Sequence, residues 1–145
     1  MSASSGPVWR LRCDGGARGN PGPGASAYIL SDAAGSEVEA RGEYLGSVTN
    51  NVAEYRALIS GLEAAVRHEV SALDVSMDSE LVVRQMTGQY RVKHEGLKPL
   101  HALARAAASK IGRVTFNSVR REHNVRADQL VNDTLDRILG SESPR

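Results

Sequence analysis

The chain of 145 residues contains 41% hydrophobic and 24% charged residues and has a net charge of +1, values ordinary for a soluble globular protein. Its length fits one domain that buries roughly 70% of its unfolded surface, and no apolar run approaches the ~20 residues of a membrane span. The first residues lack the features of a secretion signal, and Cys13, the single cysteine, excludes an internal disulfide. We therefore expect a cytoplasmic protein without a membrane partner, in which Cys13 is a buried, inert thiol.

Hydrophobic alternation, turn residues and capping residues predict nine elements in chain order. Trp9 and Leu11 alternate with arginines, which predicts a strand over residues 8–13, followed by a turn-rich stretch over 15–24. Two further strands, at 25–30 and 37–45, flank a hairpin turn. The remaining elements are a helix from 49–51 to about 67, a strand at 73–77, a short helix at 79–86, an Ala-rich helix at 100–110, a strand at 114–119 and a helix from Asn124, its N-cap, to about 139.

This order predicts an α/β fold. Three consecutive strands followed by alternating helices and strands indicate a mixed five-stranded sheet, antiparallel in its first three strands and parallel afterwards, flanked by helices. The domain is expected to span residues 8–139, between flexible ends at 1–7 and 140–145.

Four carboxylates occupy positions where an acid that meets only solvent has no evident reason to lie. Asp14 and Asp78 each end a predicted strand, and the ligands of such sheets gather at the carboxyl ends of strands. Glu54 and Asp128 each lie in the first turn of a predicted helix, at the start of an apolar stripe that for Asp128 continues to Leu139. An inward carboxylate without a partner is costly, so these positions predict a cation or hydrogen bonds.

Each acid taken alone has a simpler explanation. A carboxylate near a helix N-terminus gains ~0.3–1 kcal/mol from the helix dipole, which would suffice for Glu54 or Asp128. Asp78 could be the N-cap of the short helix after it, and Asp14 could be a turn residue. Together, however, four such side chains suit Mg²⁺, which prefers oxygen ligands, and two such ions ~3.5–4 Å apart can activate water against a phosphodiester.

The charges are segregated along the chain. Residues 32–80 contain ten acids and three bases, whereas residues 84–126 contain ten bases and two acids. Folding could place a basic surface beside an acidic site, as a phosphodiester substrate requires, or could mix both signs on the surface. The aromatic content of 4% argues against binding of single strands by base stacking.

Four sequence blocks resemble those of the type 1 ribonuclease H family. In the family's order they are Asp14-Gly-Gly-Ala-Arg-Gly-Asn-Pro-Gly-Pro-Gly24, Thr49-Asn-Asn-Val-Ala-Glu54, Asp78-Ser-Glu-Leu-Val-Val83 and Arg121-Glu-His-Asn-Val-Arg-Ala-Asp128. The resemblance covers about residues 8–139 and implies a ribonuclease H fold. It also implies an endoribonuclease that hydrolyses the RNA strand of RNA–DNA hybrids with two Mg²⁺ ions, for which Mn²⁺ can substitute, and that leaves 3′-hydroxyl and 5′-phosphate ends.

By motif position, the four acids take the family's metal-binding catalytic places. The resemblance implies that Asp14 bridges both ions, that Glu54 and Asp78 complete one site, and that Asp128 helps to hold the other.

The same blocks imply contacts with the hybrid. Asn20, Asn50 and Asn51 match positions that touch the hybrid near the cut, where an amide can both donate to and accept from a 2′-hydroxyl. Asn50 could instead only cap its helix. Thr49 is a candidate contact to a DNA phosphate, and Glu80 stands where many relatives carry an amide and is a candidate ribose contact.

The chain departs from the better-known bacterial members in two places. Residues 88–98 are too short for the basic helical insertion that grips the hybrid, as in a shorter, archaeal-like or actinobacterial-like branch. Weaker, salt-sensitive binding is therefore expected, carried by Arg91, Lys93 and Lys98. The loop that holds a histidine before the last helix is also missing, and His123 could replace that histidine or could be a plain surface residue.

Two other functions stay open. One is a DNA nuclease of the same fold, such as a junction resolvase or a transposase core, against which the first two blocks speak. The other is a catalytically inactive module that binds hybrids, against which the four acids speak. We expect a monomer. The sequence is compatible with a stand-alone protein and with one domain of a longer chain, for example one fused to a phosphatase.

Overall fold

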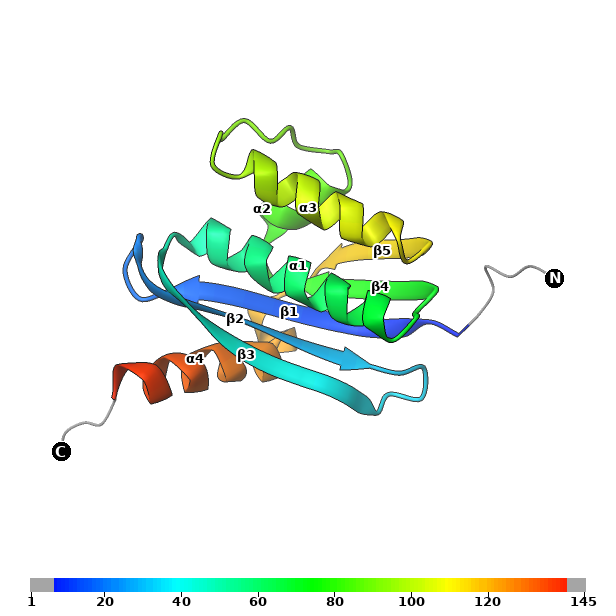
Figure 1. The fold of residues 1–145 in the computed structure, drawn as a ribbon, viewed down its shortest axis with the longest axis horizontal. Coiled ribbons are helices and arrows are strands. Elements are labelled where there is room, and N and C mark those ends of the chain that lie inside the picture. The colour runs from blue at the N-terminus through cyan, green and yellow to red at the C-terminus, as the bar shows by residue number, and fades with distance from the viewer. Residues whose placement is uncertain (1–6, 141–145) are drawn as a thin grey trace.

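One mixed β-sheet with helices on both faces makes up the fold (Figure 1). The computed structural model describes residues 7–140, so the expected flexible ends, 1–7 and 140–145, lie outside the described residues except at positions 7 and 140. The strands are β1 (Trp9–Ala17), β2 (Gly22–Ser31), β3 (Glu37–Val48), β4 (Ala72–Met77) and β5 (Arg113–Ser118). The helices are α1 (Asn50–Arg67), α2 (Glu80–Met86), α3 (Lys98–Ser109) and α4 (Val125–Leu139), with a 3-10 turn, η2 (Arg121–His123), before α4.

The sheet has the strand order β3-β2-β1-β4-β5. β2 pairs antiparallel with both β1 and β3, whereas β4 pairs parallel with both β1 and β5, which confirms the predicted mixed sheet. α1 and α3 cover one face, and α4 covers the other beneath β2 and β3 (Figure 1). Since β1 and β4 are parallel neighbours, their carboxyl ends lie at the same edge of the sheet.

Two apolar cores hold these layers together. The larger lies between the sheet and α1, where Leu11 of β1 and Leu58 of α1 are fully buried. Alternate residues of a strand face opposite sides, and the other side of β2 contributes to a smaller core made of Ala25, Ala27, Val131 and Leu135. Small residues let α4 lie close to the sheet, because a Cβ on Gly42 would lie 2.1 Å from the Thr134 Oγ1.

β1 is longer than the sequence predicts. The glycine-rich stretch predicts a strand that stops at Cys13, but β1 continues to Ala17 and pairs with β2 along the added length. The reason is close packing across the fold: a Cβ on Gly15 would lie 2.2 Å from the Ala53 carbonyl oxygen of α1. Turn propensity is a local property and does not reveal this contact.

The last two long helices also differ from the prediction at their ends. α3 begins at Lys98, two residues before the predicted start, with a proline in its first turn. The apolar stripe of α4 ends at Leu135, because Leu139 is 43% exposed, and Gly140, with a left-handed φ of 66°, ends the helix. None of the helices that the structure describes is long and apolar enough to cross a membrane.

Asn124 stands at the N-cap position of α4, but its side chain does not cap the helix. Its Nδ2 donates instead to the Cys13 carbonyl oxygen of β1 at 2.9 Å. The prediction that Asn124 caps the last helix is therefore right about the place where the helix begins and wrong about the contact.

Candidate active site

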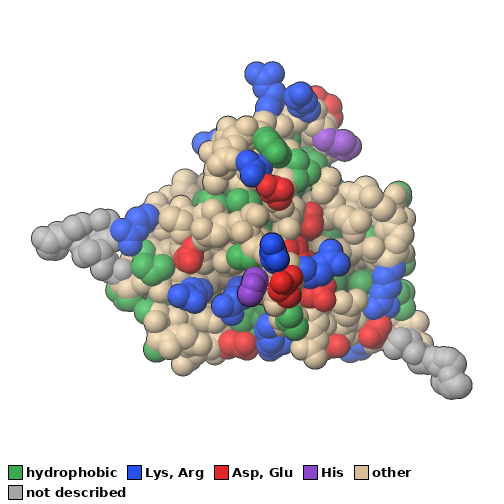
Figure 2. Space-filling model, turned by 180° about the vertical axis from the view of Figure 1, so that it is seen from behind, with side chains coloured by type: hydrophobic (Ala, Val, Ile, Leu, Met, Phe, Trp, Pro, Cys, Tyr) green, Lys and Arg blue, Asp and Glu red, His purple; other side chains and the backbone are tan. Residues whose placement is uncertain are grey.

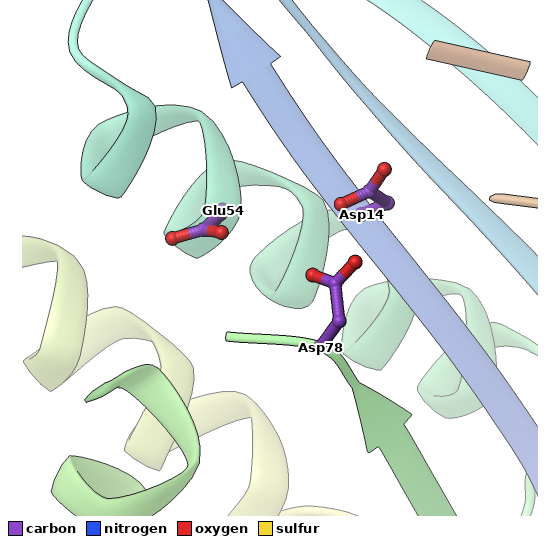
Figure 3. A group of neighbouring side chains, drawn as sticks. All are labelled: Asp14, Glu54 and Asp78. Atoms are coloured by element: carbon purple, nitrogen blue, oxygen red, sulfur yellow. The ribbon is translucent and has the colours of Figure 1, made fainter. Parts of the chain in front are cut away.

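Three carboxylates from three separate elements meet beyond the carboxyl end of β4 (Figure 3). Asp14 belongs to β1, Glu54 belongs to α1, and Asp78 directly follows β4. One oxygen atom of each lies within 4.8 Å of the other two. Residues 40 and 24 positions apart in the sequence thus share one small volume.

The sheet and α1 together cause this meeting. The parallel β1–β4 ladder ends with the pair of Cys13 and Met77, so Asp14 and Asp78 follow side by side at the same edge. α1 can bring its N-terminal part against β1 at this point because Gly15 has no side chain.

Neutral side chains cap the two helices at the site. The Thr49 Oγ1 accepts the Val52 N–H of α1 at 3.2 Å, and the Ser79 Oγ accepts the Val82 N–H of α2 at 3.2 Å. The interpretation of Asp78 as an N-cap is therefore wrong, because Ser79 is the cap and leaves the carboxylate free to face the other acids.

Glu54 lies just beyond the first turn of α1, whereas the sequence predicts it within that turn. The helix begins at Asn50, and its first turn contains no acid. Because the effect of the helix dipole falls off within the first turn, it does not account for a carboxylate at this position. Its position within the group of acids fits a role as one of several ligands of a cation.

Asp128 reaches the same cleft from the first turn of α4. Its negative charge acts on Asp14, and all four acids line one cleft of about 370 Å³. It lies outside the tight group formed by the other three. Asp14 is therefore the acid that both groups share.

Burial and mutual repulsion raise the pKa values of the clustered acids. Burial, followed by the negative charges of Asp78 and Asp128, raises the pKa of Asp14 to about 8. Burial raises the pKa of Glu54 to about 7. It also raises the pKa of Asp78, against the opposing charge of Arg121, whose Nε lies 3.8 Å from the Asp78 Oδ2. A cation bound among these oxygens would relieve the repulsion.

The donor set fits a hard divalent cation. Every candidate ligand is a carboxylate oxygen, the type of ligand that Mg²⁺ and Mn²⁺ favour. The neighbouring Cys13 is no competing ligand, because burial raises the pKa of its thiol and keeps it protonated.

Two of the predicted hybrid contacts form a short network at the rim of the cleft. The Asn20 Oδ1 accepts the Asn50 N–H at 3.0 Å, and the Asn50 Oδ1 accepts the Ala17 N–H at 2.8 Å. The Asn50 side chain therefore links α1 to β1 and does not cap its own helix. Within the described residues, the NH₂ groups of both amides have no protein partner. Asn51 lines the cleft beside them.

The other predicted contacts lie outside the cleft. Glu80 pairs with Arg84 of the same helix at 2.6 Å, so its carboxylate already has a partner. Arg91 and Lys93 are exposed on the segment between α2 and α3, and Lys98 pairs with a neighbouring glutamate at 2.6 Å.

Three polar side chains that were not among the predicted site residues also line the cleft: Arg18, Arg121 and Asn132. The Arg18 Nη2 lies 2.7 Å from the Asp136 Oδ1 and 3.3 Å from the Asn132 Oδ1, which ties the β1–β2 turn to α4. Nothing local in the sequence indicates this contact. Arg121 begins the fourth sequence block, which could have indicated it as a site residue. His123 of the same block is exposed and does not line the cleft.

Comparison with protein families gives one description for most of the chain. Residues 12–134 match the model of a family described as reverse transcriptase-like. The bifunctional protein Rv2228c of Mycobacterium tuberculosis (strain H37Rv) is 45% identical over 148 aligned residues, which cover 92% of this chain and 41% of that protein. The chain thus spans about two fifths of the length of this relative.

Solved structures give the same result. The N-terminal RNase H domain of Rv2228c, determined as a fusion with maltose-binding protein, matches with a TM-score of 0.89 at 40% identity, over 94% of this chain and 99% of that one. LC11-RNase H1 in complex with an RNA/DNA hybrid matches with a TM-score of 0.85 at 39% identity, over 91% and 99% of the two chains.

Proposed function

The chain belongs to the ribonuclease H family, and from this we propose that it is a Mg²⁺-dependent endoribonuclease that hydrolyses the RNA strand of RNA–DNA hybrids, leaving 3′-hydroxyl and 5′-phosphate ends. The observation that carries the proposal is the group of Asp14, Glu54 and Asp78, whose oxygens lie within 4.8 Å of one another. A cluster of acids with raised pKa values is unfavourable unless a cation offsets it. The similarity to a hybrid-bound relative supports the choice of substrate.

Each acid has its own part in the proposal. Asp14 would contribute ligand oxygens to both ions; Glu54 and Asp78 would hold one of them with it, and Asp128 would help to hold the other. When bound, the ions supply the positive charge that favours deprotonation of the attacking water and stabilises the departing 3′ oxygen.

The amides at the rim give the proposed preference for RNA. Asn20 and Asn50 use their oxygens within the protein, so each can offer its NH₂ group to an oxygen of the hybrid. A 2′-hydroxyl is such an acceptor and distinguishes RNA from DNA. Asn51 adds an amide within the cleft, and the Thr49 hydroxyl accepts from Val52 while its own hydrogen stays available for a DNA phosphate.

Contacts farther from the cut complete the proposal. A ribose contact by Glu80 requires that its carboxylate leave Arg84 or be shared with it. Arg91, Lys93 and Lys98 supply positive charge for the phosphate backbone in place of the missing basic insertion. We further propose that the chain acts as a monomer in the cytoplasm.

The direct test is a gel assay with labelled hybrid, duplex DNA and duplex RNA, each with Mg²⁺ and with a chelator. We expect cleavage of the RNA strand of the hybrid with Mg²⁺, in preference to either duplex, and none with the chelator. Preferred cleavage of duplex DNA would indicate the alternative nuclease, and hybrid binding without any cleavage would indicate the inactive module. Either result overturns the proposal.

Replacement of Asp14 tests the assigned role. Asp14→Asn removes the charge with little change in shape, so we expect at least a 100-fold loss of the cleavage rate with folding and hybrid binding retained. The matched control is Asp133→Asn, an exposed acid of α4 outside the cleft, which is expected to leave the rate within two-fold. Retention of a tenth of the wild-type rate by Asp14→Asn would contradict the assignment.

A further inference from the structure

Asn124 is a buried polar residue at the site that the proposed chemistry does not use. Its side chain is almost completely buried, at 1% exposure, and its Nδ2 donates to the Cys13 carbonyl oxygen across 111 positions of sequence. Its Oδ1 is the one buried side-chain oxygen or nitrogen of the described residues that has no hydrogen-bond partner. Buried polar groups are nearly always satisfied, so each exception calls for an explanation.

The backbone of the same residue makes two more connections. The Asn124 N–H donates to the Arg121 carbonyl oxygen of η2 at 2.9 Å, and the Asn124 carbonyl oxygen accepts the Asp128 N–H of α4 at 3.1 Å. One residue therefore joins three segments, and two of its three contacts lie at or next to an acid of the cleft: Cys13 precedes Asp14, and Asp128 is itself one of the acids.

The location explains why a side chain is needed there. The parallel ladder between β1 and β4 ends at Cys13, so beyond this point β4 no longer holds β1. The Asn124 amide contacts β1 at that last paired residue, immediately before Asp14. The side chain does this in place of capping α4, and its Oδ1 is left without a partner. The local contact of a helix cap is thus given up for one contact next to the acids.

We infer that Asn124 is a positioning residue that sets the distance between the Asp14 and Asp128 carboxylates and thereby the affinity of the cleft for divalent ions. The role of Asn124 in catalysis rests on the proposed function. The test by binding of a divalent ion does not depend on that function. Asn124 touches neither substrate nor the reacting atoms. It acts through the backbone of β1 and through the first turn of α4.

The test measures Mn²⁺ binding to the metal-free chain, without substrate, by the paramagnetic resonance signal of free Mn²⁺. Asn124→Ala removes the amide, and Asn124→Leu replaces it with an apolar group that has the same branched shape at Cγ, so that a second variant is available if the cavity of the first is too costly. We expect both variants to bind Mn²⁺ at least ten-fold more weakly. For hybrid cleavage we expect at least a ten-fold lower kcat and a KM within two-fold of wild type.

The control is Thr134→Val, in α4. Thr134 is as buried as Asn124, and its hydroxyl donates only to the Leu130 carbonyl oxygen. It is expected to bind Mn²⁺ as the wild type does. If the Asn124 variants bind Mn²⁺ as tightly as this control and the wild type cleaves hybrids, the inference is overturned and the proposed function is not. If the Asn124 variants bind Mn²⁺ more weakly than the wild type but the wild type cleaves no hybrid, the inference is supported and the proposed function is overturned.

Discussion

At the scale of single residues, the central feature is that Asp14 lies where its own charge is disfavoured. The side chain is buried, at 7% exposure, and three further acids share its cleft. Arg121 lies near Asp78 but is an exposed residue on a short turn, so it offsets the repulsion only in part. The proposed cation would offset this repulsion, and we expect the folded chain without metal to be less stable than it would be with neutral residues there.

This leads to a prediction for the pH dependence of stability. The pKa of Asp14 is about 8 in the folded chain and near its ordinary value of 3.8 in the unfolded chain. Between these values the folded state binds more protons than the unfolded state, so the free energy of unfolding of the metal-free chain falls as the pH rises. The loss amounts to a few kcal/mol, since one pKa unit corresponds to about 1.4 kcal/mol.

Denaturant unfolding with a chelator at pH 5 and pH 8.5 measures this effect. Asp14→Asn is expected to reduce the difference between the two pH values, with the remainder due to Glu54 and Asp78, whose pKa values are also raised. Mg²⁺ is expected to restore stability to the wild type at pH 8.5. An equal pH dependence in the wild type and in Asp14→Asn would show that the carboxylate is not strained.

At the scale of elements, the approach of α1 to β1 decides whether Glu54 reaches the other acids. A Cβ on Gly15 would lie 2.2 Å from the Ala53 carbonyl oxygen and 2.6 Å from the Glu54 N, both backbone atoms that cannot move alone. We expect Gly15→Ala to lower the free energy of unfolding by at least ~2 kcal/mol, because overpacked cores force backbone shifts. Glu54 would move away with the helix, so Mn²⁺ binding should also weaken.

The adjacent glycine provides the control for this prediction. A Cβ on Gly16 would meet nothing closer than the Asn50 Oδ1 at 4.0 Å. Gly16→Ala is therefore expected to leave the thermal unfolding midpoint unchanged or slightly raised. If both variants unfold at the same temperature as the wild type, close packing is not the reason for glycine at position 15.

The elements also show which features a sequence reveals. Alternation in β1 and the apolar faces of the long helices placed the sheet and the core correctly, since these patterns reflect burial directly. The interpretation of positions 15–17 as a turn was wrong, because glycine at position 15 allows close packing against α1, which lies almost 40 residues away in the sequence. Asn124 was assigned to its own helix because capping is the common local use of asparagine. In both cases a contact between distant elements overrode a local preference.

At the scale of the whole molecule, the segregation of charge along the chain is not seen on the face of the surface that Figure 2 shows. On the face shown in Figure 2, basic and acidic side chains lie intermixed. Part of the reason is pairing between the two segments: Arg126 lies 3.2 Å from Glu37 of β3, and Arg84 pairs with Glu80 at 2.6 Å. The proposed binding of a hybrid would therefore depend on a few basic side chains, since this face has no continuous basic surface.

Salt dependence of hybrid cleavage tests this view. Each phosphate contact contributes about 0.7–0.9 to the slope of log affinity against log salt concentration, so alanine at Arg91, Lys93 and Lys98 together should lower the slope by about 2–3 and raise KM. The control replaces Lys110 and Arg137, basic residues that do not line the cleft, and should leave the slope unchanged. An equal slope in the triple variant and the wild type would place hybrid binding elsewhere.

The central claim is that Asp14, Glu54, Asp78 and Asp128 form one site for divalent ions. A crystal soaked in Mn²⁺ and measured for anomalous scattering tests it most directly. We expect a strong peak among the oxygens of Asp14, Glu54 and Asp78, and a second peak between Asp14 and Asp128 once a hybrid is bound. Scattered side chains with no anomalous peak between them, in a crystal of the folded protein, would contradict it.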